Sequence, residues 1–310
     1  MIDTAMVCEL IELVSQNFKT EEINEIGTRL FPKFDLYGIS GTRHTQTINS
    51  RRASIILLDY CKEKKQEIKL IEFLIQLDGV PFWGRDLDIA GLETFMEKLS
   101  QAGSVYDPHK RKIVALKDSM TDSPNWGVLK ENKQYPISVL SIDIAGNSEL
   151  IKKYGDSKMQ KLYALLWARV KSKLHSYKGR IWSWAGDGGI IAFAFRGNPW
   201  NSVKFAIEIQ AALPLFYFGP SYPIADPIEL RIGIDFGKIK FRGETGSIIS
   251  EAINYASHLE KQVCAPGKIA ISEVVYKEIG KAADSFFEKH SVFEGRQCYL
   301  SRKRIDSLIR

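Results

Sequence analysis

The sequence is poor in cysteine. It has four in 310 residues, and none of them stands in a C-x-x-C pair; they are Cys8, Cys61, Cys264 and Cys298. Scattered cysteines of this kind argue against a zinc site and against a small fold held together by disulfide bonds. The chain must therefore be stabilised by apolar cores, and 310 residues are long enough for two domains that each bury a core.

The chain also lacks a long apolar run. Its most apolar stretch, residues 211–217, is too short to span a bilayer and leads into Gly219-Pro220. The first fifteen residues include Asp3, Glu9 and Glu12, an acidic content that does not suit a signal peptide. Together with the unpaired cysteines, these absences predict a cytoplasmic protein without an integral membrane segment.

A large excess of one charge is missing as well. The chain has 43 basic and 37 acidic residues, which gives a net charge of +6, and the basic residues do not form a stripe. Binding of nucleic acid leaves a concentrated basic footprint, so no nucleic-acid partner is expected. The hydrophobic and charged fractions, 45% and 26%, are those of an ordinary globular protein.

The pattern of residues changes along the chain and predicts its domains. Residues 1–103 carry amphipathic apolar stripes without strand alternation, which predicts an all-α domain. Residues 104–134 contain proline turn signals and are expected to form a linker. Residues 135–302 alternate strand and helix patterns, and residues 303–310 are expected to be a C-terminal tail.

The elements expected in residues 135–302 follow the order β-α-β-β-α-β. A single long helix is expected over 148–176, and two separate strands over 229–235 and 238–242. The other expected elements are strands at 137–142, 180–184, 189–195 and 267–271 and helices at 201–213 and 250–263. This order predicts the ferredoxin-like, split βαβ layout of an α+β domain. The layout hosts many functions, so it does not decide the activity.

Two short carboxylate motifs lie 44 residues apart in this segment. Asp143 stands in Ser141-Ile-Asp-Ile-Ala-Gly146, and Asp187 stands in Trp184-Ala-Gly-Asp-Gly-Gly189. Each motif places an Asp at the edge of a strand, next to glycine and to free backbone amides. Two such edges side by side can hold a pair of hard divalent cations, which prefer oxygen ligands. Two metals beside amide donors are an arrangement that moves phosphoryl groups.

Residues from about 137 to 299 resemble the catalytic domain of class III nucleotidyl cyclases. Besides the two Asp motifs, the resemblance rests on Leu230-Arg-Ile-Gly-Ile-Asp-Phe-Gly237 and on the late helix and strand. These last two are Ser250-Glu-Ala-Ile-Asn-Tyr-Ala-Ser-His-Leu-Glu260 and Ala265-Pro-Gly-Lys-Ile-Ala-Ile-Ser272. The pieces occur in order, at sensible spacing, over more than half of the chain. The resemblance implies a cyclase domain of ferredoxin-like fold preceded by the helical domain, and a lyase that forms a 3′,5′-cyclic nucleotide and pyrophosphate.

The resemblance also implies roles for individual residues. Asp143 and Asp187 would bind two Mg²⁺ or Mn²⁺ ions, with the Ile144 carbonyl as a further ligand. Arg231 would contact the phosphates, and Asn254 of a partner subunit would orient the ribose. The backbone amides expected to wrap the triphosphate are those of Ala145, Gly146, Asn147 and Ser148. Because the active sites of this family form between two subunits, a homodimer with shared sites is implied.

The chain departs from the family at the base-reading positions. Purine-specific members read the base four residues before the second metal Asp and seven before the Asn; these positions are Ser183 and Ser247 here. Adenine readers usually have Lys with Asp there, and guanine readers usually have Glu with a small residue. Trp182 and Trp184 flank Ser183, and regular alternation sends both to the opposite face of the strand.

A further departure concerns the cation that stabilises the transition state. The family usually has an Arg four residues after the Asn, on the same helix face. Here that position is His258, which is a cation only when protonated. Lys261, seven residues after Asn254, is an alternative candidate for the same role.

The missing purine pair is similar to what is found in the pyrimidine cyclases of bacterial Pycsar antiphage systems, which make cyclic UMP or cyclic CMP. That resemblance implies UTP or CTP as substrate, antiviral defence as the process, and a separate effector protein that the cyclic nucleotide activates. Residues 5–77 resemble bacterial death-fold-like adaptor domains, which implies a sensor or adaptor role. Two alternatives stay open: a conventional adenylate cyclase with an atypical base pocket, and a degenerate nucleotide-binding regulatory module.

Overall fold

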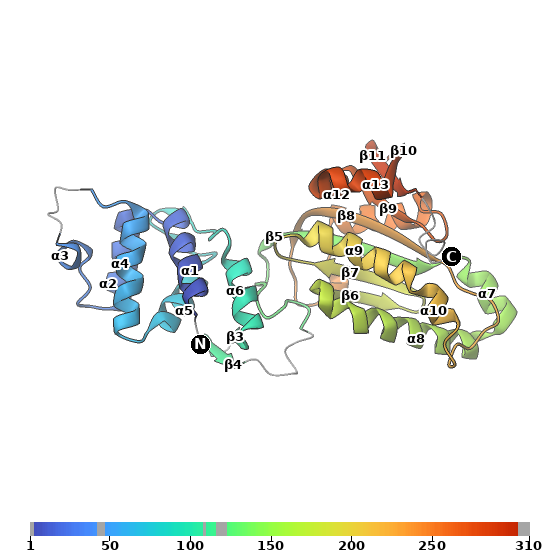
Figure 1. Ribbon diagram of the computed structural model, residues 1–310, viewed down its shortest axis with the longest axis horizontal. Helices are drawn as coiled ribbons and strands as arrows, with labels where there is room; N and C mark the ends of the chain where they lie inside the picture. The colour runs from blue at the N-terminus through green and yellow to red at the C-terminus, as the bar shows by residue number, and fades with distance from the viewer. Residues whose placement is uncertain (1–2, 42–46, 108–109, 116–122, 303–310) are drawn as a thin grey trace. The chain divides into compact units, whose positions relative to one another are not determined.

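The computed structural model describes residues 3–41, 47–107, 110–115 and 123–302, so the predicted tail at 303–310 lies outside the described residues. The chain forms two compact units, Met1–Leu129 and Lys130–Arg310 (Figure 1). The boundary between them falls inside the segment predicted as a linker. That segment also contains a pair of antiparallel strands, β3 (Ser104–Asp107) and β4 (Lys112–Ala115).

The first unit is largely helical, as the sequence predicts. Its helices are α1 (Thr4–Asn17), α2 (Thr20–Leu30), α3 (Leu36–Ser40), α4 (Ser50–Glu63), α5 (Glu67–Leu77) and α6 (Leu92–Gln101). The sequence did not predict the strand pair β1 (Pro81–Phe82) and β2 (Arg85–Asp86). Strands of two residues are too short to show alternation, and the turn between them depends on Trp83 and Gly84, which both have positive φ.

The second unit is built on a seven-stranded sheet with the strand order β10-β11-β9-β8-β5-β7-β6. The strands are β5 (Gln134–Ile144), β6 (Gly179–Ala185), β7 (Gly188–Phe193), β8 (Leu230–Lys240), β9 (Ile269–Ser272), β10 (Phe287–Phe293) and β11 (Arg296–Ser301). Only the β8–β9 pair is parallel among the strand pairs of this sheet. The predicted α+β layout of the C-terminal half is therefore confirmed.

Helices cover this sheet, and Figure 1 shows α9 lying across it. The helices of this unit are α7 (Asn147–Tyr154), α8 (Asp156–Leu174), α9 (Asn198–Ala211), α10 (Leu213–Tyr217), α11 (Glu251–His258), α12 (Glu273–Ile279) and α13 (Ala283–Phe286). A π-helical segment, Leu259–Val263, continues α11. None of the described helices is long and apolar enough to cross a membrane.

Two sequence predictions about these elements are wrong in detail, and one pair of strands was missed. The strands expected at 229–235 and 238–242 are one strand, β8, because its pairing with β5 is unbroken from Leu230–Ile144 to Lys240–Gln134. The helix expected at 148–176 is broken into α7 and α8 at Gly155, whose φ of 79° lies outside the helical region. The hairpin formed by β10 and β11 was not predicted at all.

The central strand β8 has two different faces. Leu230, Ile232 and Ile234 point into the main core, which also contains Leu162, Leu166 and Val170 of α8 and Phe205 of α9. The intervening residues of β8, Arg231 and Gly233, therefore face the other side of the sheet. A Cβ on Gly233 would overlap the carbonyl oxygen of Ala256 and lie 2.5 Å from the backbone nitrogen of Glu260. Only glycine lets α11 and its π-helical continuation pack this closely on β8.

Candidate active site

Two strand pairings bring the predicted metal ligands together. Asp143 near the end of β5 is the direct cross-strand partner of Arg231 on β8, so both side chains lie on the same face. Asp187 lies in the turn of the β6–β7 hairpin, and β7 pairs with β5. A Cβ on Gly188 would overlap the carbonyl oxygen of Ile142 and lie 3.1 Å from Oδ1 of Asp143. Glycine at 188 therefore allows the hairpin to place Asp187 beside Asp143.

The two carboxylates interact strongly. Burial, followed by a hydrogen bond with Asp143 and the negative charge of that residue, raises the pKa of Asp187 to about 6. Arg231 partly offsets this, and its Nη2 donates to Oδ2 of Asp143 at 2.7 Å. The guanidinium of Arg231, on one side of Asp143, thus partly compensates the charge of two carboxylates that face each other.

This donor set fits hard divalent cations. Facing carboxylates repel each other unless a proton or a cation lies between them, and Mg²⁺ or Mn²⁺ would relieve that repulsion. The described residues include no group of three or more His, Cys, Asp or Glu side chains that could hold a metal alone. Magnesium commonly completes its coordination with water, backbone oxygen and substrate phosphate, so two carboxylates suffice for it.

A cavity of about 330 Å³ opens at these carboxylates. It is lined by Asp143, Ile144, Gly146, Asn147, Ser148, Glu149, Asp187 and Arg231. Helix α7 begins here after Gly146, whose φ of 67° favours glycine. The first amides of a helix have no partner within it, so those of Asn147 and Ser148 can donate to an anion.

One predicted amide is not available in the structure. The N–H of Ala145 donates to the carbonyl oxygen of Glu229 at 2.8 Å, and this bond continues the β5–β8 ladder by one residue. The predicted role of the Ala145 amide in wrapping a triphosphate is therefore not supported. Gly146, Asn147 and Ser148 remain as the candidate phosphate-binding turn.

The predicted base-reading residues lie elsewhere in the same unit. Ser183 is exposed on β6, and Ser247 is exposed in the 3₁₀ turn Thr245–Ser247, where its Oγ donates to the Glu244 carbonyl at 2.7 Å. A hydrogen bond of 2.7 Å from Thr245 Oγ1 to the Trp182 carbonyl ties this turn to β6. The two serines thus belong to neighbouring elements, and neither lines the cavity at Asp143.

The strand that carries Ser183 is not regular. The register of β6 against β7 shifts between Ile181 and Ser183, as at a β-bulge. Trp184 packs against the main core, whereas the buried Trp182 packs on Phe241 at a ring distance of 6.1 Å. The two tryptophans therefore do not share one face, because the bulge breaks the alternation that the sequence predicts.

The three candidates on α11 and its continuation also lie away from the cavity. Asn254 is exposed on α11, and Lys261 is exposed on the π-helical segment. Nδ1 of His258 lies 2.6 Å from Oε1 of Glu294, which follows β10 in the same chain. Within one chain, none of these three residues lines the cavity at Asp143.

Sequence reasoning missed Glu260, although it ends the motif quoted for the late helix. Its side chain is 1% exposed, and its Oε1 lies 3.0 Å from Nε of Arg231. Burial, and then the negative charge of Asp143, raises the pKa of Glu260 to about 7, although Arg231 acts in the opposite direction. The sequence feature that could have identified Glu260 is its place four positions after the buried Ala256, which puts an acidic residue on the apolar stripe of the helix.

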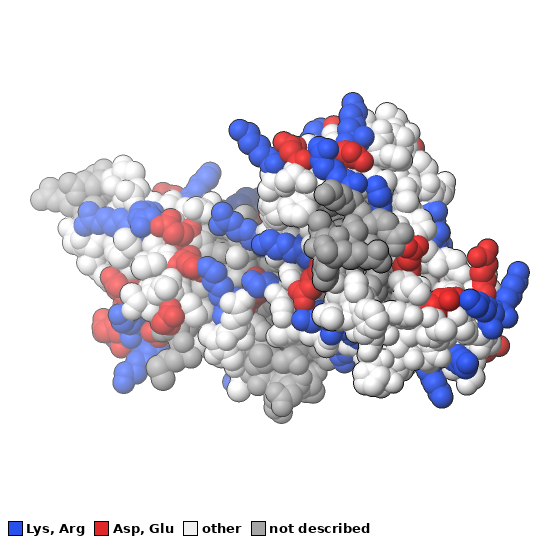
Figure 2. All heavy atoms as spheres, turned by 45° about the vertical axis from the view of Figure 1, so that its right-hand side comes forward, with Lys and Arg blue, Asp and Glu red and all other residues white. Residues whose placement is uncertain are grey.

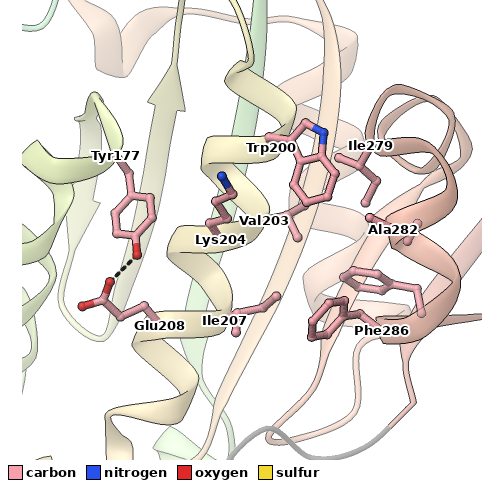
Figure 3. A pocket seen from close by; sticks show the side chains of 11 residues that line it. Tyr177, Trp200, Val203, Lys204, Ile207, Glu208, Ile279, Ala282 and Phe286 are labelled. Carbon is pink, nitrogen blue, oxygen red and sulfur yellow. Dashed lines mark hydrogen bonds between the residues drawn. The ribbon is translucent and has the colours of Figure 1, made fainter.

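A second cavity, of about 430 Å³, lies on the core side of the unit (Figure 3). Figure 3 shows Trp200, Val203 and Ile207 of α9 opposite Ile279, Ala282 and Phe286. At its edge, the Tyr177 hydroxyl donates to the Glu208 carboxylate. This mostly apolar lining does not suit a triphosphate.

Figure 2 shows acidic and basic side chains intermixed on the visible face, without a surface of one sign.

About half of the chain is similar in sequence to a protein named as a putative adenylate cyclase. A 154-residue segment, 48% of the chain, is 28% identical to a protein named putative adenylate cyclase 3 from Rhizobium meliloti (strain 1021). The matched segment spans only 24% of the length of that relative. No protein-family model matches the chain.

Solved cyclase structures are similar to the same share of the chain. The adenylyl cyclase CyaB from P. aeruginosa is 22% identical, with a TM-score of 0.48 over 56% of this chain and 97% of that one. The guanylate cyclase domain of RhGC from Catenaria anguillulae, in complex with GTP, is 18% identical, with a TM-score of 0.47 over 56% and 99%.

Proposed function

We propose that the chain is a nucleotidyl cyclase, a phosphorus–oxygen lyase that converts a nucleoside triphosphate into its 3′,5′-cyclic nucleotide and pyrophosphate. The observation that carries this proposal is one cavity that joins the Asp143–Asp187 pair, Arg231 and the start of α7. These groups supply oxygen ligands, a fixed cation and amide donors. Positioning and charge stabilisation of this kind are what phosphoryl transfer needs from a protein.

Each group in the cavity has a part in this reaction. Asp143 and Asp187, with the Ile144 carbonyl, would hold two Mg²⁺ or Mn²⁺ ions, which supply Lewis acidity and lower the pKa of the ribose 3′-hydroxyl. The amides of Gly146, Asn147 and Ser148 would hold the oxygens of the triphosphate. Arg231 would keep Asp143 oriented and add positive charge at the phosphates.

The active site is proposed to form between two copies of the chain. Asn254, His258 and Lys261 belong to α11 and its continuation, and none of them lines the cavity at Asp143. A partner copy that supplies this helix would complete the site, with Asn254 orienting the ribose and His258 or Lys261 as the cation near the transition state. In a twofold-symmetric dimer, both sites are then completed in the same way.

The proposed substrate is UTP or CTP. Ser183 and Ser247 are exposed and uncharged, so they lack the reach and the charge of a purine-reading pair. A serine hydroxyl both donates and accepts, and can therefore pair with the N3–H of uracil or with N3 of cytosine. The cyclic nucleotide would serve as a second messenger in antiphage defence that acts on a separate effector, with residues 1–103 as the sensor or adaptor.

One experiment separates this function from its alternatives. The purified chain is incubated with each of the four ribonucleoside triphosphates and Mn²⁺, and the products are identified by mass spectrometry. Cyclic UMP or cyclic CMP as the main product supports the proposal. Cyclic AMP would instead support a conventional adenylate cyclase, which the name of the R. meliloti relative favours. Absence of any cyclic product would leave a degenerate nucleotide-binding module.

The metal assignment has its own test. Asp143→Ala and Asp187→Ala are each expected to abolish cyclisation, because one carboxylate cannot replace the pair that holds two ions. Circular dichroism should remain that of the parent protein, since both side chains lie at the edge of the core. Full turnover by either variant, in Mg²⁺ or Mn²⁺, would contradict the two-metal assignment.

A further inference from the structure

A row of three charged side chains extends from the candidate metal site into the interior. Asp143 accepts a hydrogen bond from Arg231, and Arg231 in turn lies 3.0 Å from Glu260. The side chains of Asp143 and Arg231 are 23% and 25% exposed, whereas that of Glu260 is only 1% exposed. A carboxylate this deeply buried is costly unless another charge compensates it.

Two features of the backbone hold Glu260 in this place. Gly233, two residues after Arg231 on β8, lets the helix approach until a Cβ at 233 would lie 3.0 Å from Cβ of Glu260. The residue also belongs to the π-helical segment that follows α11, and such segments are frequent at functional sites. The side chain is thus directed at the guanidinium by close packing.

Charge explains why such a residue would be useful here. Arg231 next to Asp143 repels any divalent cation that Asp143 binds, and it competes with that cation for the Asp143 carboxylate. A second carboxylate on the far side of the guanidinium offsets part of this repulsion and shares the guanidinium with Asp143. Without it, the arginine would pair with Asp143 alone.

We propose that Glu260 is a positioning residue that keeps the candidate metal site open to divalent cations by sharing the guanidinium of Arg231 with Asp143 and offsetting part of its charge. This inference rests on the two-metal site of the proposed function. Glu260 acts only through Arg231 and does not itself touch the ions.

The test measures Mn²⁺ binding to the purified full chain, without nucleotide, from the free-ion signal in electron paramagnetic resonance. It is done at pH 8.0, above the pKa of Glu260. Glu260→Gln keeps the size of the side chain and removes its charge, and is expected to raise the Mn²⁺ dissociation constant by about tenfold or more. Arg231→Met is expected to lower that constant. Glu278→Gln, on the exposed face of α12, makes the same change in net charge and should leave the constant unchanged.

The double variant distinguishes a charge effect from damage to the fold. Glu260→Gln combined with Arg231→Met removes both charges, and its Mn²⁺ dissociation constant should return to within about threefold of the parent value. Parent-like binding by Glu260→Gln alone, or binding by the double variant as weak as that of Glu260→Gln, would overturn the proposal. Because no turnover is measured, a failure of the cyclase assignment would show separately, as absence of product in the nucleotide assay.

Discussion

Replacing Glu260 with glutamine is expected to change how the stability of the protein depends on pH. Glutamine resembles the protonated acid, so the variant has nothing to ionise at this position. In the parent protein, the pKa of Glu260 is raised from 4.5 to about 7, mainly by burial. The folded state therefore binds this proton more tightly than the unfolded state does, and the parent protein loses stability as the pH rises from about 4.5 to about 7.

The magnitude follows from the size of the shift. Each pKa unit corresponds to about 1.4 kcal/mol, so a shift from 4.5 to about 7 amounts to about 3 kcal/mol once the pH is above 7. About 2 kcal/mol of this would be lost between pH 5.5 and pH 8.5. Arg231 attracts the ionised carboxylate, but at this site the cost of burial exceeds the gain from the ion pair.

The assay is urea unfolding of both proteins at several pH values, followed by tryptophan fluorescence. Four of the six tryptophans, Trp167, Trp182, Trp184 and Trp200, lie in the unit that contains Glu260. The difference in unfolding free energy, variant minus parent, should grow by about 2 kcal/mol from pH 5.5 to pH 8.5. Taking a difference removes the titration of groups common to both proteins. Parallel pH profiles would refute the reasoning.

This outcome also has a bearing on function. Glu260→Gln is expected to be more stable than the parent at pH 8 and yet weaker in binding Mn²⁺. A side chain that only supported the fold would change both properties in the same direction. Opposite changes would indicate that the buried charge is retained for the site at a cost in stability.

Three further predictions concern packing, assembly and the base pocket. Gly233→Ala should destabilise the second unit by about 3 kcal/mol in urea unfolding, because the new Cβ would meet backbone atoms that cannot move aside. Mixing inactive Asp143→Ala with inactive Asn254→Ala should restore part of the cyclase activity; no recovery after demonstrated subunit exchange would contradict a shared site. Ser183→Lys with Ser247→Asp should lower kcat/KM for UTP and CTP, and a parent protein most active on ATP or GTP would contradict the pyrimidine assignment.

Local patterns in the sequence were sufficient for several conclusions. The periodicity of apolar residues predicted the helical first unit and the alternating elements of the second, because each pattern reports which face of a segment is buried. The two Asp motifs identified Asp143 and Asp187, and the structure brings both to one cavity with Arg231. Each of these conclusions depends on residues that are close in sequence.

Strand pairing and helix packing decided the rest. The unbroken pairing of β5 with β8 merged two expected strands into one, and the bulge near Ser183 separated Trp182 from Trp184. The Ala145 amide is engaged only because β8 lies beside it. None of these contacts could be read from a single segment, because each depends on how one strand pairs with another.

Glu260 shows most clearly the difference between what local sequence indicates and what tertiary packing decides. The sequence shows an acidic residue on the apolar stripe of a helix, which signals an exception but not its partner. The partner is Arg231, 29 positions earlier in the chain, and the two meet only because Gly233 lets the helix rest on β8. The sequence by itself indicated most of the residues that are candidates for the chemistry. The tertiary structure decided which of them meet, because burial and charge pairing arise only when distant segments pack together.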